Sequence, residues 1–184
     1  MEIQASRSRA RVGPAGEPVL LLDQNRALWD QLLIRRGLAA LERAEQFGGA
    51  DGLYVLQAAI AACHARAGAA AETDWPRIVS LYDSLARLRP SPVVQLNRAV
   101  AVAMAHGPEA GLPLIDALRA EPTLKSYHLL PSVRGDLLVK LGRLEEARLE
   151  FERVATLTRN ALDRDFLLGR AAAARSQSSS DGPQ

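Results

Sequence analysis

Apolar residues recur along the chain at steps of three and four, and clusters of Pro and Gly separate the segments that show this pattern. Such spacing is typical of amphipathic helices. No segment alternates polar and apolar residues over a length that would form a sheet, so we expect an all-α fold with short connections. The pattern predicts about eight helices, at Arg26–Phe47, Leu53–Ala67, between Asp74 and Pro90, and at Val93–Ala105, Ala110–Ala120, Leu124–Leu141, Leu144–Leu157 and Leu162–Ala174.

Residue types at the ends of these segments predict where helices begin and stop. Asp23 is placed to cap the first helix, and Gly48 follows its last periodic position. Asp74 is placed to cap the third helix, with Pro76 in the first turn, where its missing N–H costs little.

An aromatic or aliphatic residue recurs at helix-pair spacing. Tyr82, Ile115 and Phe151 are separated by 33 and 36 residues, which brackets the period of 34 that is typical of tetratricopeptide helix pairs. The period predicts a tetratricopeptide-like helical-repeat superhelix of antiparallel helix pairs.

The segment from Gly135 to Phe151 resembles that repeat most closely. We expect the small residues Gly135 and Ala147 to let two helices approach, and Leu138 and Phe151 to fill the gap between them. The same roles fall, with lower fidelity, on Ala99, Val102, Gly111 and Ile115.

Composition narrows the possible classes of protein. Of 184 residues 48% are hydrophobic but only 4% aromatic, which favours a core of Ala and Leu in helices over sheets. Lys and Arg number 23 and Asp and Glu 21, so no large basic surface for nucleic acid is expected. Cys63 is the single cysteine and excludes an internal disulfide. With no secretory leader and no run of eighteen apolar residues, we expect a cytoplasmic protein that contacts no membrane.

No constellation of residues points to catalysis or to a metal or cofactor. His64, His106 and His128 lie apart and do not resemble a helical zinc motif. There is no Gly-rich phosphate loop, and no nucleophile on a sharp turn beside a base. Carboxylate pairs such as Glu145-Glu146 are typical of a solvated helix face. We therefore expect a protein that is not an enzyme and holds no cofactor.

Two polar clusters are candidate protein-docking sites. Asn97 occupies a position where helical repeats often bind a peptide backbone, and Arg98 beside it is a second groove candidate. Bonds from both residues to neighbouring helices are the favoured interpretation. The second cluster either forms a docking edge or has a structural role, with an Asp helix cap and the Trp packed into the first helix pair. Its members are Asp23, Gln24, Arg26 and Trp29.

Several sequence blocks together resemble one protein family. They are Met1 to Arg7, Leu20 to Asp30, Leu56 to Ala65, Thr73 to Trp75, Pro90 to Ala103, Tyr127-His128 and Leu157 to Asn160. The chain, as far as about Arg170, resembles the C-terminal extension of a group of extracytoplasmic-function (ECF) RNA polymerase sigma factors, which is a tetratricopeptide-like helical domain. Asn25 departs from the family, which usually has Asp there, and this weakens the case for a charged docking cluster.

The resemblance implies a role in transcription initiation. Residues 1–25 would be a partly extended lead-in at the end of a sigma-domain linker, residues 26–175 the helical domain and residues 176–184 a disordered tail. The implied partner is the sigma core or RNA polymerase, with no direct contact to nucleic acid, and the chain would be part of a longer protein. The alternative is a free-standing adaptor that binds a peptide or protein in a concave groove.

Overall fold

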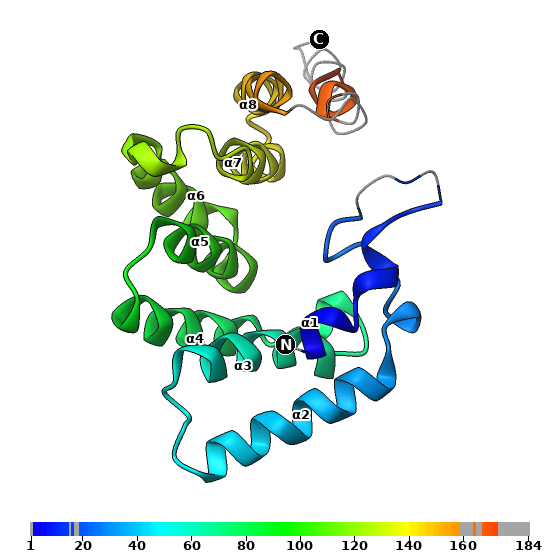
Figure 1. The fold of residues 1–184 in the computed structure, drawn as a ribbon. Coiled ribbons are helices and arrows are strands. Elements are labelled where there is room, and N and C mark those ends of the chain that lie inside the picture. The colour runs from blue at the N-terminus through cyan, green and yellow to red at the C-terminus, as the bar shows by residue number, and fades with distance from the viewer. Residues whose placement is uncertain (1, 15, 17–18, 159–163, 165–166, 173–184) are drawn as a thin grey trace. The chain divides into compact units, whose positions relative to one another are not determined.

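The computed structural model describes residues 2–14, 16, 19–158, 164 and 167–172 (Figure 1). Within these residues the fold is all-α, as predicted, and contains no β-strand. None of the helices described is long and apolar enough to cross a membrane. The chain divides into two compact units, residues 1–90 and 91–184.

The described residues of unit 1 form one short α-helix and three long ones. They are α1 (Glu2–Ala5), α2 (Gln31–Gln46), α3 (Leu53–Arg66) and α4 (Trp75–Leu88). Helix α3 packs against both α2 and α4, while α1 lies against α2 and α3. The pairing of α3 with α4 is the antiparallel arrangement that the helical periodicity predicts.

The segment before α2 contains helical turns and buried side chains. Residues Ser8–Arg11 and Arg26–Leu28 each form a 3-10 turn. Ile3 of α1 is buried against α2 at Gly37, where a Cβ atom would lie 2.5 Å from Ile3 Cγ1. Part of the expected lead-in is therefore packed into unit 1. The predicted tail, residues 176–184, lies outside the described residues.

Helix caps in unit 1 agree with the sequence at one helix and differ at another. Asp74 caps α4 by accepting a hydrogen bond from the Arg77 N–H at 2.9 Å, as predicted. Helix α2, however, is capped by Asp30, whose Oδ1 accepts from the Leu32 and Leu33 N–H groups. The prediction that Asp23 caps this helix was wrong, because the 3-10 turn at Arg26–Leu28 and the extended Trp29 delay its start.

The described part of unit 2 contains two helix pairs. Helix α5 (Pro92–His106) pairs with α6 (Pro108–Ala117), and α7 (Leu129–Lys140) pairs with α8 (Leu144–Leu157). Helix α6 also packs against α7, and residues 167–172 are helical. Helix α7 begins five residues later than the predicted Leu124. Pro131 has no N–H to bond the Tyr127 carbonyl, so it is tolerated only in a first helical turn.

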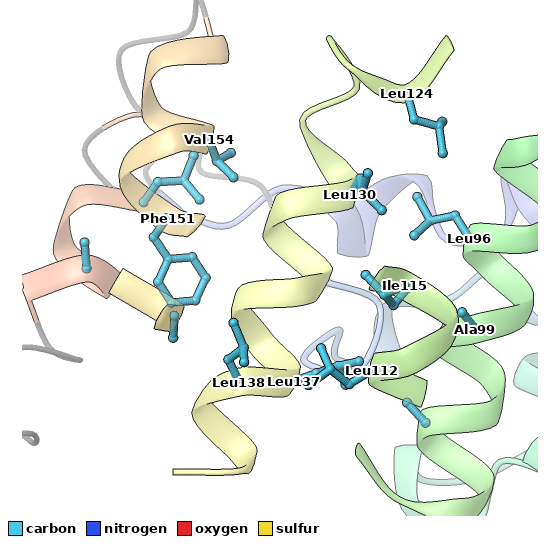
Figure 2. Close-up of a cluster of buried hydrophobic side chains, with 14 of the residues drawn as sticks. Leu96, Ala99, Leu112, Ile115, Leu124, Leu130, Leu137, Leu138, Phe151 and Val154 are labelled. Carbon is cyan, nitrogen blue, oxygen red and sulfur yellow. The ribbon is translucent and has the colours of Figure 1, made fainter. Parts of the chain in front are cut away.

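The core of unit 2 joins the four long helices (Figure 2). In the contact between α7 and α8, the roles predicted from the repeat are taken by Gly135, Leu138, Ala147 and Phe151. Leu138, Ala147 and Phe151 are fully buried, and a Cβ on Gly135 would lie 2.5 Å from the Phe151 ring. The other buried apolar side chains include Leu96, Ala99, Leu112, Ile115, Leu124, Leu130, Leu137 and Val154.

Candidate functional site

Arg26 links the segment before α2 to the far end of α3. Its guanidinium donates hydrogen bonds to the main-chain oxygens of His64 and Ala67, the latter at 2.8 Å, and to Thr73 Oγ1 at 3.2 Å. The last carbonyls of a helix have no partner within the helix and carry partial negative charge. Arg26 therefore supplies hydrogen-bond donors to the carbonyls at the C-terminal end of α3, and its positive charge lies next to their partial negative charge.

Trp29 lies beneath Arg26 in the interior of unit 1. Its side chain is only 3% exposed and packs with Ala10 and Ile34. The guanidinium of Arg26 lies 5.0 Å from the ring centroid, and that of Arg7 lies 5.7 Å from it. Such cation–π contacts stabilise a partly desolvated arginine. The Trp29 ring is therefore buried within unit 1 and is not part of its exposed surface.

The remaining members of the predicted cluster differ in exposure. Gln24 is buried, and its Nε2 donates to the Val19 carbonyl at 3.2 Å. Asp23 is exposed. Of the four residues, Asp23 is the one whose side chain is open to a partner.

His64 is buried beside this cluster. Its ring packs edge to face against Trp75, with 5.2 Å between centroids, and its Nδ1 makes no hydrogen bond in the described structure. Burial, together with the positive charges of Arg7 and Arg26, lowers the pKa of His64 to about 4. The imidazole is therefore neutral at physiological pH, which suits a packed position.

The other two candidates belong to unit 2. Asn97 and Arg98 lie on α5, where Asn97 is exposed and Arg98 is half-buried. Asn97 is thus accessible to a partner on its helix. A docking role for these two residues stays a prediction.

Unit 2 also contains a buried charge network, which the sequence analysis did not predict. The Arg134 side chain is 8% exposed, and its Nε lies 2.7 Å from Asp116 Oδ1 and its Nη1 2.9 Å from Glu150 Oε1. Glu146 lies 3.6 Å from the same guanidinium. Burial lowers the pKa of Arg134, but the hydrogen bonds and charges of Asp116 and Glu150 outweigh it and raise that pKa. The network joins α6, α7 and α8.

Unit 1 contains a groove of about 560 Å³ between α1, α2 and α3, which we call the α2–α3 groove. Its long walls consist mainly of short side chains, because alanines face it from both helices. The wall residues are Gly37, Ala39, Ala40, Leu41 and Ala44 of α2 and Val55, Ala58 and Ala61 of α3. This groove was not predicted from the sequence. Alanines recur at helical spacing on both helices, but that spacing does not give the distance between the helices.

The rim of the α2–α3 groove contains the larger polar side chains. Arg36 and Arg43 border it on α2, Tyr54 and Gln57 on α3, and Glu2 at the α1 end. Glu2 Oε1 lies 2.9 Å from Arg36 Nη2, whereas Arg43 has no ion pair within the described residues. Tyr54 is 75% exposed. The groove thus combines an apolar floor with cations on one long wall.

Comparison with known proteins relates this chain to others without an assigned activity. Residues 1–45 match the model of a family of unknown function (DUF6596). An uncharacterized protein of Rhizobium meliloti (strain 1021) is 46% identical over 165 residues, which cover 90% of this chain and 38% of that protein. The chain therefore spans well under half the length of this relative. No solved structure matches the present chain.

Proposed function

We propose that the chain is the C-terminal regulatory and interaction domain of an ECF-type RNA polymerase sigma factor. It would act in transcription initiation by docking on the sigma core or on the polymerase. The observation that carries the proposal is the series of sequence blocks, from Leu20 to Asp30 through to Leu157 to Asn160, that resembles this extension. The helix-pair fold agrees with such a domain, because stacked pairs present surfaces to protein partners.

The length of the Rhizobium meliloti relative supports the same proposal. More than half of that protein lies outside the segment that matches, since the match covers 38% of it. A sigma factor needs promoter-reading domains in addition to such an extension. The remaining length of the relative is available for them.

The alternative is a free-standing helical-repeat adaptor that binds a peptide. The α2–α3 groove favours this alternative in one respect, since its volume of about 560 Å³ lies within the range of ligand-binding clefts. The two functions differ in what the gene encodes beside this segment. An adaptor would have no promoter-reading domain in the same polypeptide.

The decisive experiment is promoter-dependent transcription with purified RNA polymerase. First, the DNA upstream of the Met1 codon is read in frame to find the longer protein that it encodes. Transcription with that longer protein is then compared with transcription by a variant of it that lacks residues 1–184. We expect coding sequence for a sigma core, and a severalfold change in transcript when the domain is removed. An upstream stop codon without such sequence, or equal transcript from both proteins, would contradict the proposal.

Point variants that test docking must change exposed side chains, so that the fold of the domain is not altered. Replacing Trp29 or Arg26 would disturb the packing of unit 1 as well as any docking, since Trp29 is buried and Arg26 binds three acceptors. Asp23→Lys and Asn97→Lys change exposed side chains. Each is expected to alter transcription if its residue contacts the core, with circular dichroism confirming an unchanged fold.

A further inference from the structure

We propose that the α2–α3 groove binds one face of an acidic amphipathic helix, contributed by the sigma core of the same polypeptide. The inference rests on the proposed function and names the partner element and the surface that receives it.

The floor fits the apolar side of a helix. The short alanine side chains of α2 and α3 line a hollow of about 560 Å³, large enough for several aliphatic side chains. Amphipathic helices bind such grooves through apolar residues at positions i, i+3, i+4 and i+7. Tyr54, exposed on the rim, adds an aromatic ring of the type that often dominates binding energy.

The charges on the rim specify an acidic partner. Arg36 and Arg43 are seven residues apart on α2, so both lie on one face of the helix, about 10 Å apart along its axis. Among the described lining residues, α3 contributes no charged side chain, and Glu2 pairs with Arg36. The unpaired charge at Arg43 therefore favours a carboxylate on the bound helix. A second carboxylate seven residues away would reach Arg36 in competition with Glu2.

The position of α1 favours the same polypeptide as the source. Glu2, Ile3 and Gln4 of α1 form one end of the groove. In the proposed sigma factor the core precedes this helix, so its chain enters beside the groove. A short tether raises the effective concentration of a linked helix into the millimolar range, which makes a weak contact sufficient for docking. The family match at residues 1–45 includes the α1 and α2 walls.

A direct binding test uses synthetic peptides and the 184-residue chain. The probe is a fluorescein-labelled peptide of about 18 residues with Leu at i, i+3, i+4 and i+7 and Glu at two flanking positions seven apart. Its matched control has Lys in place of both Glu residues. Fluorescence polarisation at low ionic strength is expected to show about tenfold tighter binding of the Glu peptide. Equal affinity for the two peptides, or no binding, would overturn the proposal.

Two variants locate the binding on the chain. Arg43→Glu is expected to reverse the preference between the peptides, while Arg35→Glu, on the same helix but outside the groove, leaves it unchanged. Ala40→Leu places a larger side chain in the groove and is expected to weaken the Glu peptide about tenfold, whereas Ala117→Leu in α6 does not. Ala40 and Ala117 are exposed, so both variants are expected to fold. Equal effects of a groove variant and its control would place the peptide elsewhere.

The same variants separate this inference from the proposed function. In transcription with the longer protein, Ala40→Leu is expected to reproduce the effect of removing residues 1–184. If removal changes transcription and Ala40→Leu does not, the groove inference is wrong and the proposed function stands. If removal changes nothing while the peptide results hold, the groove binds acidic helices and the sigma-factor function is wrong.

Discussion

Arg26 donates a hydrogen bond to the main-chain oxygen of Ala67, 41 residues further along the chain, at 2.8 Å. The same guanidinium bonds the His64 carbonyl and lies over Trp29. One side chain thus closes the C-terminal end of α3 and covers the central aromatic ring of unit 1. Through Arg26, the C-terminal end of α3 is bound to the segment before α2 that contains Trp29.

Replacing Arg26 by Ala is expected to destabilise unit 1 by about 1–3 kcal/mol, because hydrogen bonds from a charged group are lost and two partly buried carbonyls lose their donor. Trp29 and Trp75 both belong to unit 1, so tryptophan fluorescence during urea unfolding reports on that unit alone. Arg9→Ala, which changes an exposed arginine of the same segment, serves as control. Identical urea midpoints for the two variants would refute the role assigned to Arg26.

Stability is expected to depend on pH through His64. Its pKa is lowered to about 4 in the folded chain from an ordinary value of 6.5, so the unfolded chain binds more protons between these pH values. The contribution of neutral His64 to the free energy of unfolding is therefore fully present above about pH 6.5 and is lost as the pH drops toward 4. The loss amounts to about 2 kcal/mol between pH 7 and pH 5.

The His64 prediction is checked by urea unfolding of the His64→Gln variant at pH 7 and pH 5. This variant is expected to lose that part of the pH dependence, whereas His106→Gln, at an exposed position, keeps it. A wild-type pH dependence in the His64→Gln protein would show that another group is responsible.

The substitution Gly135→Ala is expected to destabilise unit 2. The added Cβ would lie 2.5 Å from the Phe151 ring, and overpacking of this kind costs about 1–3 kcal/mol, which exceeds the gain of up to about 1 kcal/mol in helix propensity. Thermal unfolding followed by circular dichroism measures the change. In the control Gly169→Ala nothing lies within 4 Å of the new Cβ, so that protein is expected to be as stable as the wild type or more so.

The buried network of Arg134 is expected to be sensitive to removal of one partner. Arg134→Met leaves Glu150, also 8% exposed, without its cation, and an unpaired buried charge costs about 3–5 kcal/mol. The double variant Arg134→Met, Glu150→Leu is expected to recover much of this loss. Arg143→Ala, which breaks an exposed pair with Glu146, is expected to cost less than about 1 kcal/mol. A double variant no more stable than Arg134→Met alone would contradict this account.

Local signals in the sequence were sufficient for most of the helices. Pro92 lies in the first turn of α5 and Gly107 caps its C-terminal end, and α8 begins and ends at the predicted residues Leu144 and Leu157. The close approach of α7 and α8 at Gly135 was also predicted from the sequence. In the tetratricopeptide repeat, a small residue on one helix of a pair faces a large side chain on the other, and Gly135 and Phe151 match these positions. In each case the deciding residues are close in the chain or related by a fixed period.

Features that depend on competition between similar residues were harder to predict. Asp23 and Asp30 are both suitable caps, and the tertiary contacts of Arg26 and Trp29 fix the intervening turn, so only Asp30 takes the role. The α2–α3 groove could not be anticipated for a related reason. Its volume depends on how far apart two alanine-lined helices are held, and Ile3 against Gly37 sets part of that spacing.

The packing of the first residues into unit 1 bears on where the chain tolerates cleavage. Ile3 fills the space beside Gly37, Ala10 packs with Trp29, and the Ser6 carbonyl accepts a hydrogen bond from the Asp30 N–H at 2.9 Å. A protease that removed residues 1–25 would uncover Trp29 and the hollow between α2 and α3. The shortened product would be expected to aggregate through this newly exposed apolar surface, so the helical domain defined by its repeats alone, from Arg26 onward, would be a poor unit to isolate.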